Sequence, residues 1–138
     1  MLAKGDIHEA AFAGHLQAIE QHLNLGEDPN TATMHGLTPL HKAAMNGNLQ
    51  CAQLLVRHGA QVNIADVAGF TPLHFAASNG YLDVVKWLVE DCNASPMLPS
   101  NKGRTPRVVA KKRGHNKVAL YMSQVESKLE GQMWFGTA

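Results

Sequence analysis

Three histidines, His8, His41 and His74, recur at a constant spacing of 33 residues and have the clearest capacity for chemistry in this chain. A neutral imidazole can ligate a transition metal or act as a general base near pH 7. A metal site, however, needs three or four ligands that converge on one point. Equivalent positions in a repeating chain lie about one repeat width apart, so we expect these imidazoles neither to share a metal ion nor to form a catalytic centre.

The other reactive side chains do not suggest an enzyme. Cys51 falls on an apolar helical stripe and is predicted to be a small buried hydrophobic residue, whereas Cys92 is expected to be more exposed. Two cysteines are too few for a disulfide framework. The sequence has no glycine-rich phosphate loop, nucleophile elbow or His-Glu-x-x-His motif. We therefore predict a non-enzymatic protein without a metal or cofactor.

Length and composition are those of one globular domain. The chain has 138 residues, of which 45% are hydrophobic. It contains no apolar run of about 18 residues that would span a membrane. Its N-terminus lacks the apolar core of a secretory leader, and its cysteine content fits a reducing compartment. We expect a self-contained unit in the cytoplasm or nucleus.

An internal repeat organises the sequence. Thr-Pro pairs begin at Thr38, Thr71 and Thr105, and the segments "GHLQAIEQHL", "GNLQCAQLLV" and "GYLDVVKWLV" superpose without a gap. The period predicts four copies, at about residues 1–32, 33–65, 66–99 and 100–130, within a single domain 1–130. Residues 131–138 are then a C-terminal tail.

The sequence pattern of each copy predicts two helices. The Thr hydroxyl can cap the free N–H groups at a helix start, and Pro suits the first helical position. Gly47 and Gly59 are placed to end the two helices of the second copy, because helix C-termini often require positive φ. One copy cannot bury its own apolar face, but stacked copies can. The fold class is therefore predicted to be all-α, a solenoid of stacked helix-turn-helix units.

The period and the sequences "TPLHKAA" and "TPLHFAA" closely resemble the ankyrin repeat, over about residues 4–125. This resemblance implies an ankyrin-repeat solenoid whose units are joined by β-turn or finger loops. It also implies that His41 and His74 tie the helix start to adjoining loops through hydrogen bonds. The implied function is a non-catalytic protein-protein interaction module, an adaptor, scaffold or stoichiometric regulator. The identity of its protein partner stays open.

The resemblance places partner contacts on the loop tips and on the exposed side of each first helix. Most of these positions differ between copies, whereas their neighbours repeat, so they are free for binding. The candidate partner-binding residues are Phe12, Met34, His35, Leu37, Lys42, Met45, Asn46, Val67, Ala68, Phe70, Phe75, Ser78, Asn79, Lys102, Arg104, Lys112 and Arg113. We expect Leu37, Met45 and Phe70 in particular to form an exposed apolar surface, with core packing as the alternative.

The ends of the chain depart from the pattern. Asp6 stands in place of the first Thr-Pro and still favours a helix start. Asn93 takes the place of Gly59 and suits a left-handed cap. The last helix is expected to run past the repeat, up to Gly131. Trp134 or Phe135 then either folds back on that helix or belongs to a disordered or partner-anchoring tail.

Charge separates the two ends of the chain. Residues 1–100 carry four basic and nine acidic side chains, and residues 101–138 carry eight basic and two acidic ones. The basic run is interpreted first as a solubilising end of the solenoid. The alternative is a site for an acidic, phosphorylated or nucleic-acid ligand, or a signal for nuclear import, with nucleic acid the less favoured ligand.

Overall fold

The computed structural model describes residues 6–136, which form helices joined by turns and loops and contain no strand. This confirms the all-α prediction. In chain order the helices are α1 (Ile7–Ala13), α2 (Leu16–Asn24), α3 (Pro39–Met45), α4 (Leu49–Arg57), α5 (Pro72–Ser78), α6 (Leu82–Glu90), α7 (Pro106–Lys112) and α8 (Asn116–Gly136).

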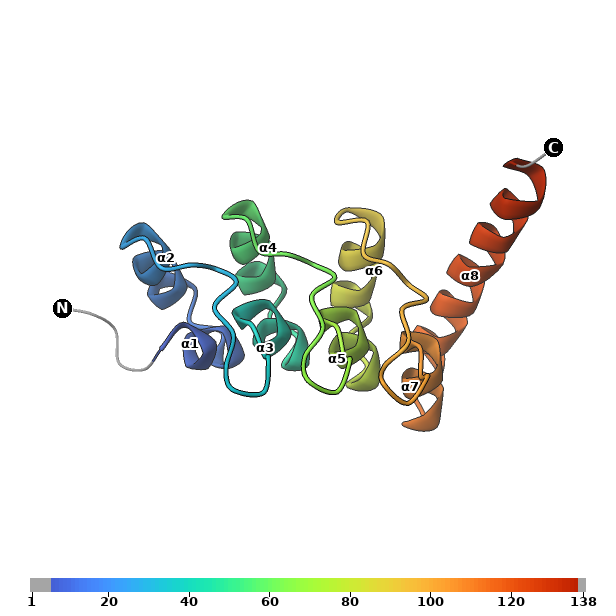
Figure 1. Cartoon of the computed structure of the whole chain (residues 1–138), viewed down its shortest axis with the longest axis horizontal. Coiled ribbons are helices and arrows are strands. Elements are labelled where there is room, and N and C mark those ends of the chain that lie inside the picture. The colour runs from blue at the N-terminus through green and yellow to red at the C-terminus, as the bar shows by residue number, and fades with distance from the viewer. Residues whose placement is uncertain (1–5, 137–138) are drawn as a thin grey trace.

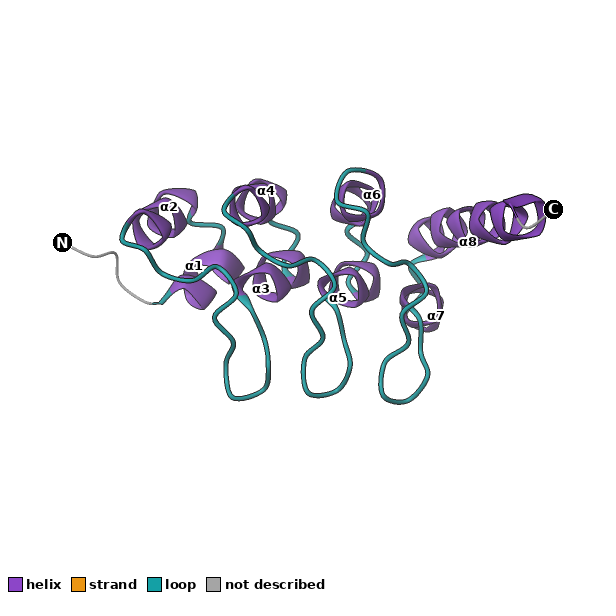
Figure 2. Cartoon of the chain, turned by 45° about the horizontal axis from the view of Figure 1, so that its top comes forward, coloured by secondary structure: helices purple, strands orange, loops and turns teal. Residues whose placement is uncertain are grey.

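The helices pair and the pairs stack side by side. Figure 1 shows an inner row of α1, α3, α5 and α7 below an outer row of α2, α4, α6 and α8. Three loops project from the inner row on one side of the stack, as Figure 2 shows. Each α-helical pair matches one copy of the sequence repeat, so the predicted solenoid is confirmed.

Hydrophobic burial between neighbouring pairs holds the stack together. The inner helices contribute fully buried alanines, among them Ala43 and Ala76, whose small side chains let helices approach closely. The outer helices contribute larger side chains at one repeating position, where Leu55, Leu88 and Met122 are fully buried. No helix in the described part of the chain is both long and apolar enough to cross a bilayer.

The predicted helix starts are confirmed by their hydrogen bonds. The hydroxyl of Thr38 accepts the backbone N–H of His41, and Thr71 and Thr105 cap α5 and α7 in the same way. In the first copy the carboxylate of Asp6 accepts the N–H of Glu9 at 2.9 Å. The helices α3, α5 and α7 therefore begin at the Thr-Pro residues that the repeat predicts, whereas α1 begins at Ile7, one residue later than the period alone would place it.

Two glycines after the inner helices serve a second purpose besides the helix end. Gly47 and Gly80 have φ of +69° and +80°, as expected. A Cβ at Gly47 would lie 2.5 Å from the ring of Tyr81, and one at Gly80 would lie 2.5 Å from Nδ1 of His115. These glycines therefore also allow the next unit to approach. Asn93, with φ of +55°, adopts the left-handed conformation predicted for it.

Three hairpin loops, residues 33–37, 66–70 and 100–104, are called fingers here. In each finger the first side chain accepts the backbone N–H of the last residue: Thr33, Asp66 and Ser100 have this role. Neighbouring fingers are also joined, since Val67 donates its N–H to the carbonyl oxygen of His35 at 3.0 Å. In the next pair of fingers, Asn101 donates its backbone N–H to the carbonyl oxygen of Ala68, also at 3.0 Å. These bonds hold the fingers in a row.

The last helix is longer than the others. It passes Gly131, where the tail was expected to begin, and continues to Gly136. Arg107 anchors it through Nε, which lies 2.8 Å from a carboxylate oxygen of Glu126. The alternatives for Trp134 and Phe135 concern side chains that lie outside the described part of the structure, as does the order of the last two residues.

Candidate partner-binding groove

The two best-buried histidines use both of their ring nitrogens within the fold. Nδ1 of His41 accepts the backbone N–H of Thr38 at 3.1 Å, and its Nε2 lies 2.9 Å from the carbonyl oxygen of Phe70. A carbonyl can only accept, so Nε2 carries the proton and the ring is neutral. His74 repeats this arrangement with Thr71 and Arg104. Each ring therefore ties the start of an inner helix to the base of the following finger.

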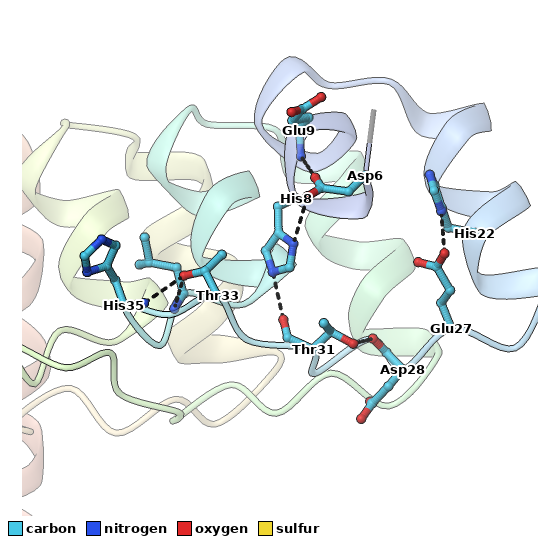
Figure 3. Close-up of polar contacts among 10 residues, drawn as sticks. Asp6, His8, Glu9, His22, Glu27, Asp28, Thr31, Thr33 and His35 are labelled. Atoms are coloured by element: carbon cyan, nitrogen blue, oxygen red, sulfur yellow. Dashed lines mark hydrogen bonds and ion pairs between the residues drawn. The ribbon is translucent and has the colours of Figure 1, made fainter. Parts of the chain in front are cut away.

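The electrostatic environment favours the neutral rings. Burial lowers the pKa of both His41 and His74, and the hydrogen bonds to backbone carbonyls oppose this effect. His8 also bonds to a loop, with Nε2 2.8 Å from the carbonyl oxygen of Thr31 (Figure 3). These contacts confirm the structural role predicted for the repeating histidines.

One further buried histidine is less well satisfied. Nδ1 of His22 lies 2.9 Å from a carboxylate oxygen of Glu27 (Figure 3), but its Nε2 is buried without a protein partner. His22 occupies the position at which later copies have Leu55, Leu88 and Met122. No group of three or more potential metal ligands occurs among the residues that the structure describes.

The two thiols lie where the sequence placed them. Cys51 is almost fully buried on the apolar side of α4, and Cys92 is half-buried. Burial raises the pKa of both thiols, and at Cys92 the charge of Asp91 raises it further. A raised pKa keeps a thiol protonated at neutral pH, so neither cysteine has the character of an activated nucleophile.

The candidate partner residues lie along the angle between the fingers and the inner helices, which we call the groove. The fingers contribute one set of side chains at their tips and another at their bases. The tips carry Met34, His35, Val67, Ala68 and Lys102, all exposed, and the bases carry Leu37, Phe70 and Arg104, all half-buried. The inner helices and the residues just after them add exposed Phe12, Asn46, Lys112 and Arg113 and half-buried Lys42, Met45, Phe75, Ser78 and Asn79.

Two of the candidates hold the stack together. Asn46 donates its side-chain N–H to the carbonyl oxygen of Phe12 at 2.8 Å, and Asn79 donates to that of Met45 at 2.7 Å. Asn48 and Asn101, which sequence reasoning missed, make similar bonds between units. Asn46 and Asn79 are the same residue type at one repeat position, and that identity is the signal that could have revealed their role.

The apolar candidates are less uniform than predicted. Leu37, Met45 and Phe70 are half-buried, whereas Met34 and Val67 at the fingertips are 89% and 64% exposed. Phe70 is partly covered because its ring packs against Phe75, with 5.7 Å between ring centroids. Among the candidate residues, the most exposed apolar side chains are therefore those of the fingertips.

Two hollows lie within the groove. The C-terminal hollow has a volume of about 290 Å³ and is lined by Phe70, His74, Phe75, Ser78, Arg104, Val109, Lys112 and Arg113. The N-terminal hollow has a volume of about 310 Å³ and is lined by Asp6, His8, Glu9, Phe12, Thr33 and Lys42. Most of the aromatic and basic candidates of repeats three and four thus come together at one place.

A larger hollow of about 780 Å³ lies outside the groove. It separates the end of α6 from the middle of α8, and Val89, Tyr121 and Leu129 contribute to its lining. The hydroxyl of Tyr121 donates to the carboxylate of Glu90 across it, at 2.8 Å. Burial, and secondly the hydrogen bond to the Glu90 carboxylate, raise the pKa of Tyr121 to about 12.

A family model for ankyrin repeats, in three copies, matches residues 7–100. The chain belongs to the ankyrin-repeat family. The match ends before α7, and the fourth ankyrin unit is evident from the structure, where Thr105 caps α7 and α7 packs against α5. A comparison with curated protein sequences found no match for this ankyrin-repeat protein. Ankyrin repeats generally serve as protein-protein interaction modules, so the groove and fingers are the natural candidates for its binding surface.

Proposed function

We propose that this ankyrin-repeat protein binds a partner protein through the groove and fingertips, as an adaptor, scaffold or stoichiometric regulator without catalytic activity. The observation that carries the proposal is the exposure of Met34 and Val67 at adjacent fingertips. Neither side chain is needed to cover the core. An exposed apolar pair on a rigid support is well suited to form the buried centre of an interface.

The rigidity of the fingers supports the same function. The bond from the N–H of Val67 to the carbonyl oxygen of His35 and the bond from the N–H of Leu37 to the hydroxyl of Thr33 fix the tips before any partner arrives. Binding to a preformed surface avoids much of the entropy cost of ordering loops. The buried histidines of this protein are already hydrogen-bonded within the fold, and the raised pKa of the Cys51 thiol keeps it protonated. Both observations favour a binding role over a chemical one.

Affinity capture with matched variants tests the proposal. The double variant Met34→Ser/Val67→Ser removes the fingertip pair, and Leu25→Ser is the control, because Leu25 is 66% exposed but lies at the end of α2. We expect at least one captured protein to be lost from the double variant and kept by the control. Equal capture by both variants and the unmodified protein would refute the assignment of the surface.

A further inference from the structure

We propose that the C-terminal hollow binds an acidic peptide segment of the partner, with one apolar side chain inserted against Phe70 and Phe75 and flanking carboxylates on the basic rim. The proposal rests on the proposed function, because it specifies what the groove recognises. It also gives a role to the basic end of the chain.

The floor of the hollow is aromatic and fixed in place. The ring of Phe70 meets His74 edge to face with 5.5 Å between centroids, and Phe75 meets His41 in the same way at 5.8 Å. Both imidazoles are held at both nitrogens, so the two phenyl rings pack on immobile neighbours. The two phenylalanines remain partly exposed, and an apolar guest would remove their remaining surface from water.

The size of the hollow restricts the guest. Its volume of about 290 Å³ lies at the lower limit for small-molecule pockets, which span roughly 300–1,000 Å³. Val109 adds a further apolar side chain to its lining. The space therefore suits one large side chain better than a nucleotide or an extended cofactor.

The rim of the hollow is basic and unpaired. Arg104, Lys112 and Arg113 line it, and none has a carboxylate within 4.0 Å among the described residues. Arg104 is also held at its backbone, since its N–H donates to Ser100 and its carbonyl accepts from His74. Arginine and lysine side chains attract carboxylates, and arginine can bind them through two parallel hydrogen bonds.

The charge of the remaining groove favours a peptide over a nucleic acid. Asp6 and Glu9 line the N-terminal hollow, so a uniformly anionic strand along the groove would meet repulsion there. An acidic peptide can confine its negative charge to the region of Arg104, Lys112 and Arg113. The aromatic rings also face one another at a tilt inside a small hollow, rather than forming an open stacking platform.

A titration followed by 1H–15N NMR tests this inference with the acetylated, amidated peptide Glu-Glu-Phe-Glu-Glu. The control peptides are Glu-Glu-Ser-Glu-Glu and Lys-Lys-Phe-Lys-Lys. We expect saturable shifts of Phe75, Ser78 and Val109 with the first peptide, and at least tenfold weaker binding of both controls. Equal binding of the serine peptide would overturn the aromatic anchor. An absence of saturable shifts with the first peptide would overturn the proposal as a whole.

Protein variants complete the test with a matched pair. Lys112→Glu should weaken binding of the acidic peptide at least tenfold, whereas Lys111→Glu should change the affinity less than twofold. The two changes alter net charge equally, and both lysines are exposed on α7, but only Lys112 lines the hollow. Ser78→Trp should abolish binding by filling the hollow. Equal effects of the two lysine variants would refute a local site.

Two further probes separate the ligand classes. The first probe is the peptide Glu-Glu-Phe-Glu-Glu with phosphotyrosine in place of phenylalanine, and the second is a single-stranded oligonucleotide. Neither should bind tenfold more tightly than the original peptide. Tighter binding of either would replace the acidic-peptide assignment. If the peptide fails while Met34→Ser/Val67→Ser still loses a captured protein, this inference fails and the proposed function stands. If the peptide binds while the double variant loses no captured protein, the hollow is supported and the fingertip surface is refuted.

Discussion

Nε2 of His74 donates a hydrogen bond to the carbonyl oxygen of Arg104 at 2.9 Å, which joins the start of α5 to the base of the third finger. Arg104 in turn lines the C-terminal hollow. A histidine that first suggested catalysis therefore positions a residue with a proposed binding role. The link between fold and function in this protein runs through such bonds between one unit and the next.

Removing this histidine should destabilise the whole domain. His74→Ala leaves the N–H of Thr71 and the carbonyl of Arg104 without their partner and opens a cavity in a buried site. We expect the free energy of unfolding to fall by about 2–4 kcal/mol. Urea denaturation measures the change. His35→Ala is the control, because His35 is exposed, and it should cost less than about 0.5 kcal/mol. Similar small losses for both variants would contradict the structural role.

Stability should also depend on the neutral state of these rings. The folded pKa values of His41 and His74 lie below the ordinary value of 6.5, so between the two values the unfolded chain binds more protons. Stability is therefore fully present above about pH 6.5 and is lost as pH falls toward the lowered values. Urea midpoints measured between pH 7.5 and 5 should decrease steadily, and by less in His74→Gln. A midpoint that stays constant or rises on acidification would exclude this linkage.

The unsatisfied histidine of the first unit offers a stabilising change. His22→Leu restores the residue type of Leu55 and Leu88 and removes a buried nitrogen that has no protein partner. Glu27, which is exposed, would return to water without penalty. We expect a gain of about 0.5–2 kcal/mol in unfolding free energy. A loss of stability in thermal and urea unfolding would show that the bond to Glu27 outweighs the unpaired nitrogen.

Close approach between units can be separated from backbone strain with two glycines. Gly114→Ala places an alanine at positive φ, +81°, in open space and should cost about 1–2 kcal/mol. Gly47→Ala, at the equivalent repeat position and a similar φ of +69°, also drives a Cβ toward the ring of Tyr81. It should cost at least about 1 kcal/mol more, as overpacking does. Equal costs in urea denaturation would mean that Tyr81 moves aside freely.

The repeat made most of the fold predictable because the same cue occurs several times. Thr38, Thr71 and Thr105 all cap helices, and Gly47 and Gly80 both take positive φ, so one local rule accounts for each set. The continuation of α8 past Gly131 was not foreseen. Glycine disfavours a helix interior without forbidding it, and sequence alone does not fix which outcome prevails.

The groove was predictable in position but not in detail. Phe75 is half-buried partly because its ring packs against His41 of the preceding unit, with 5.8 Å between ring centroids, a contact that no single repeat encodes. Asn46 and Asn79 were assigned to a partner, yet their amides bond to carbonyls of the preceding unit. Contacts between units depend on the stacking geometry, which the letters of one unit do not reveal.

The central claim is that the groove side of the stack contacts another protein, and site-specific photo-crosslinking tests it most directly. A benzophenone amino acid would replace either Met34 at a fingertip or Leu25 at the end of α2. Each variant would then be irradiated in a lysate of the protein's own source. We predict a discrete crosslinked protein from position 34 and none of that mass from position 25. The same adduct from both positions, or none from position 34, would contradict the assignment of this surface.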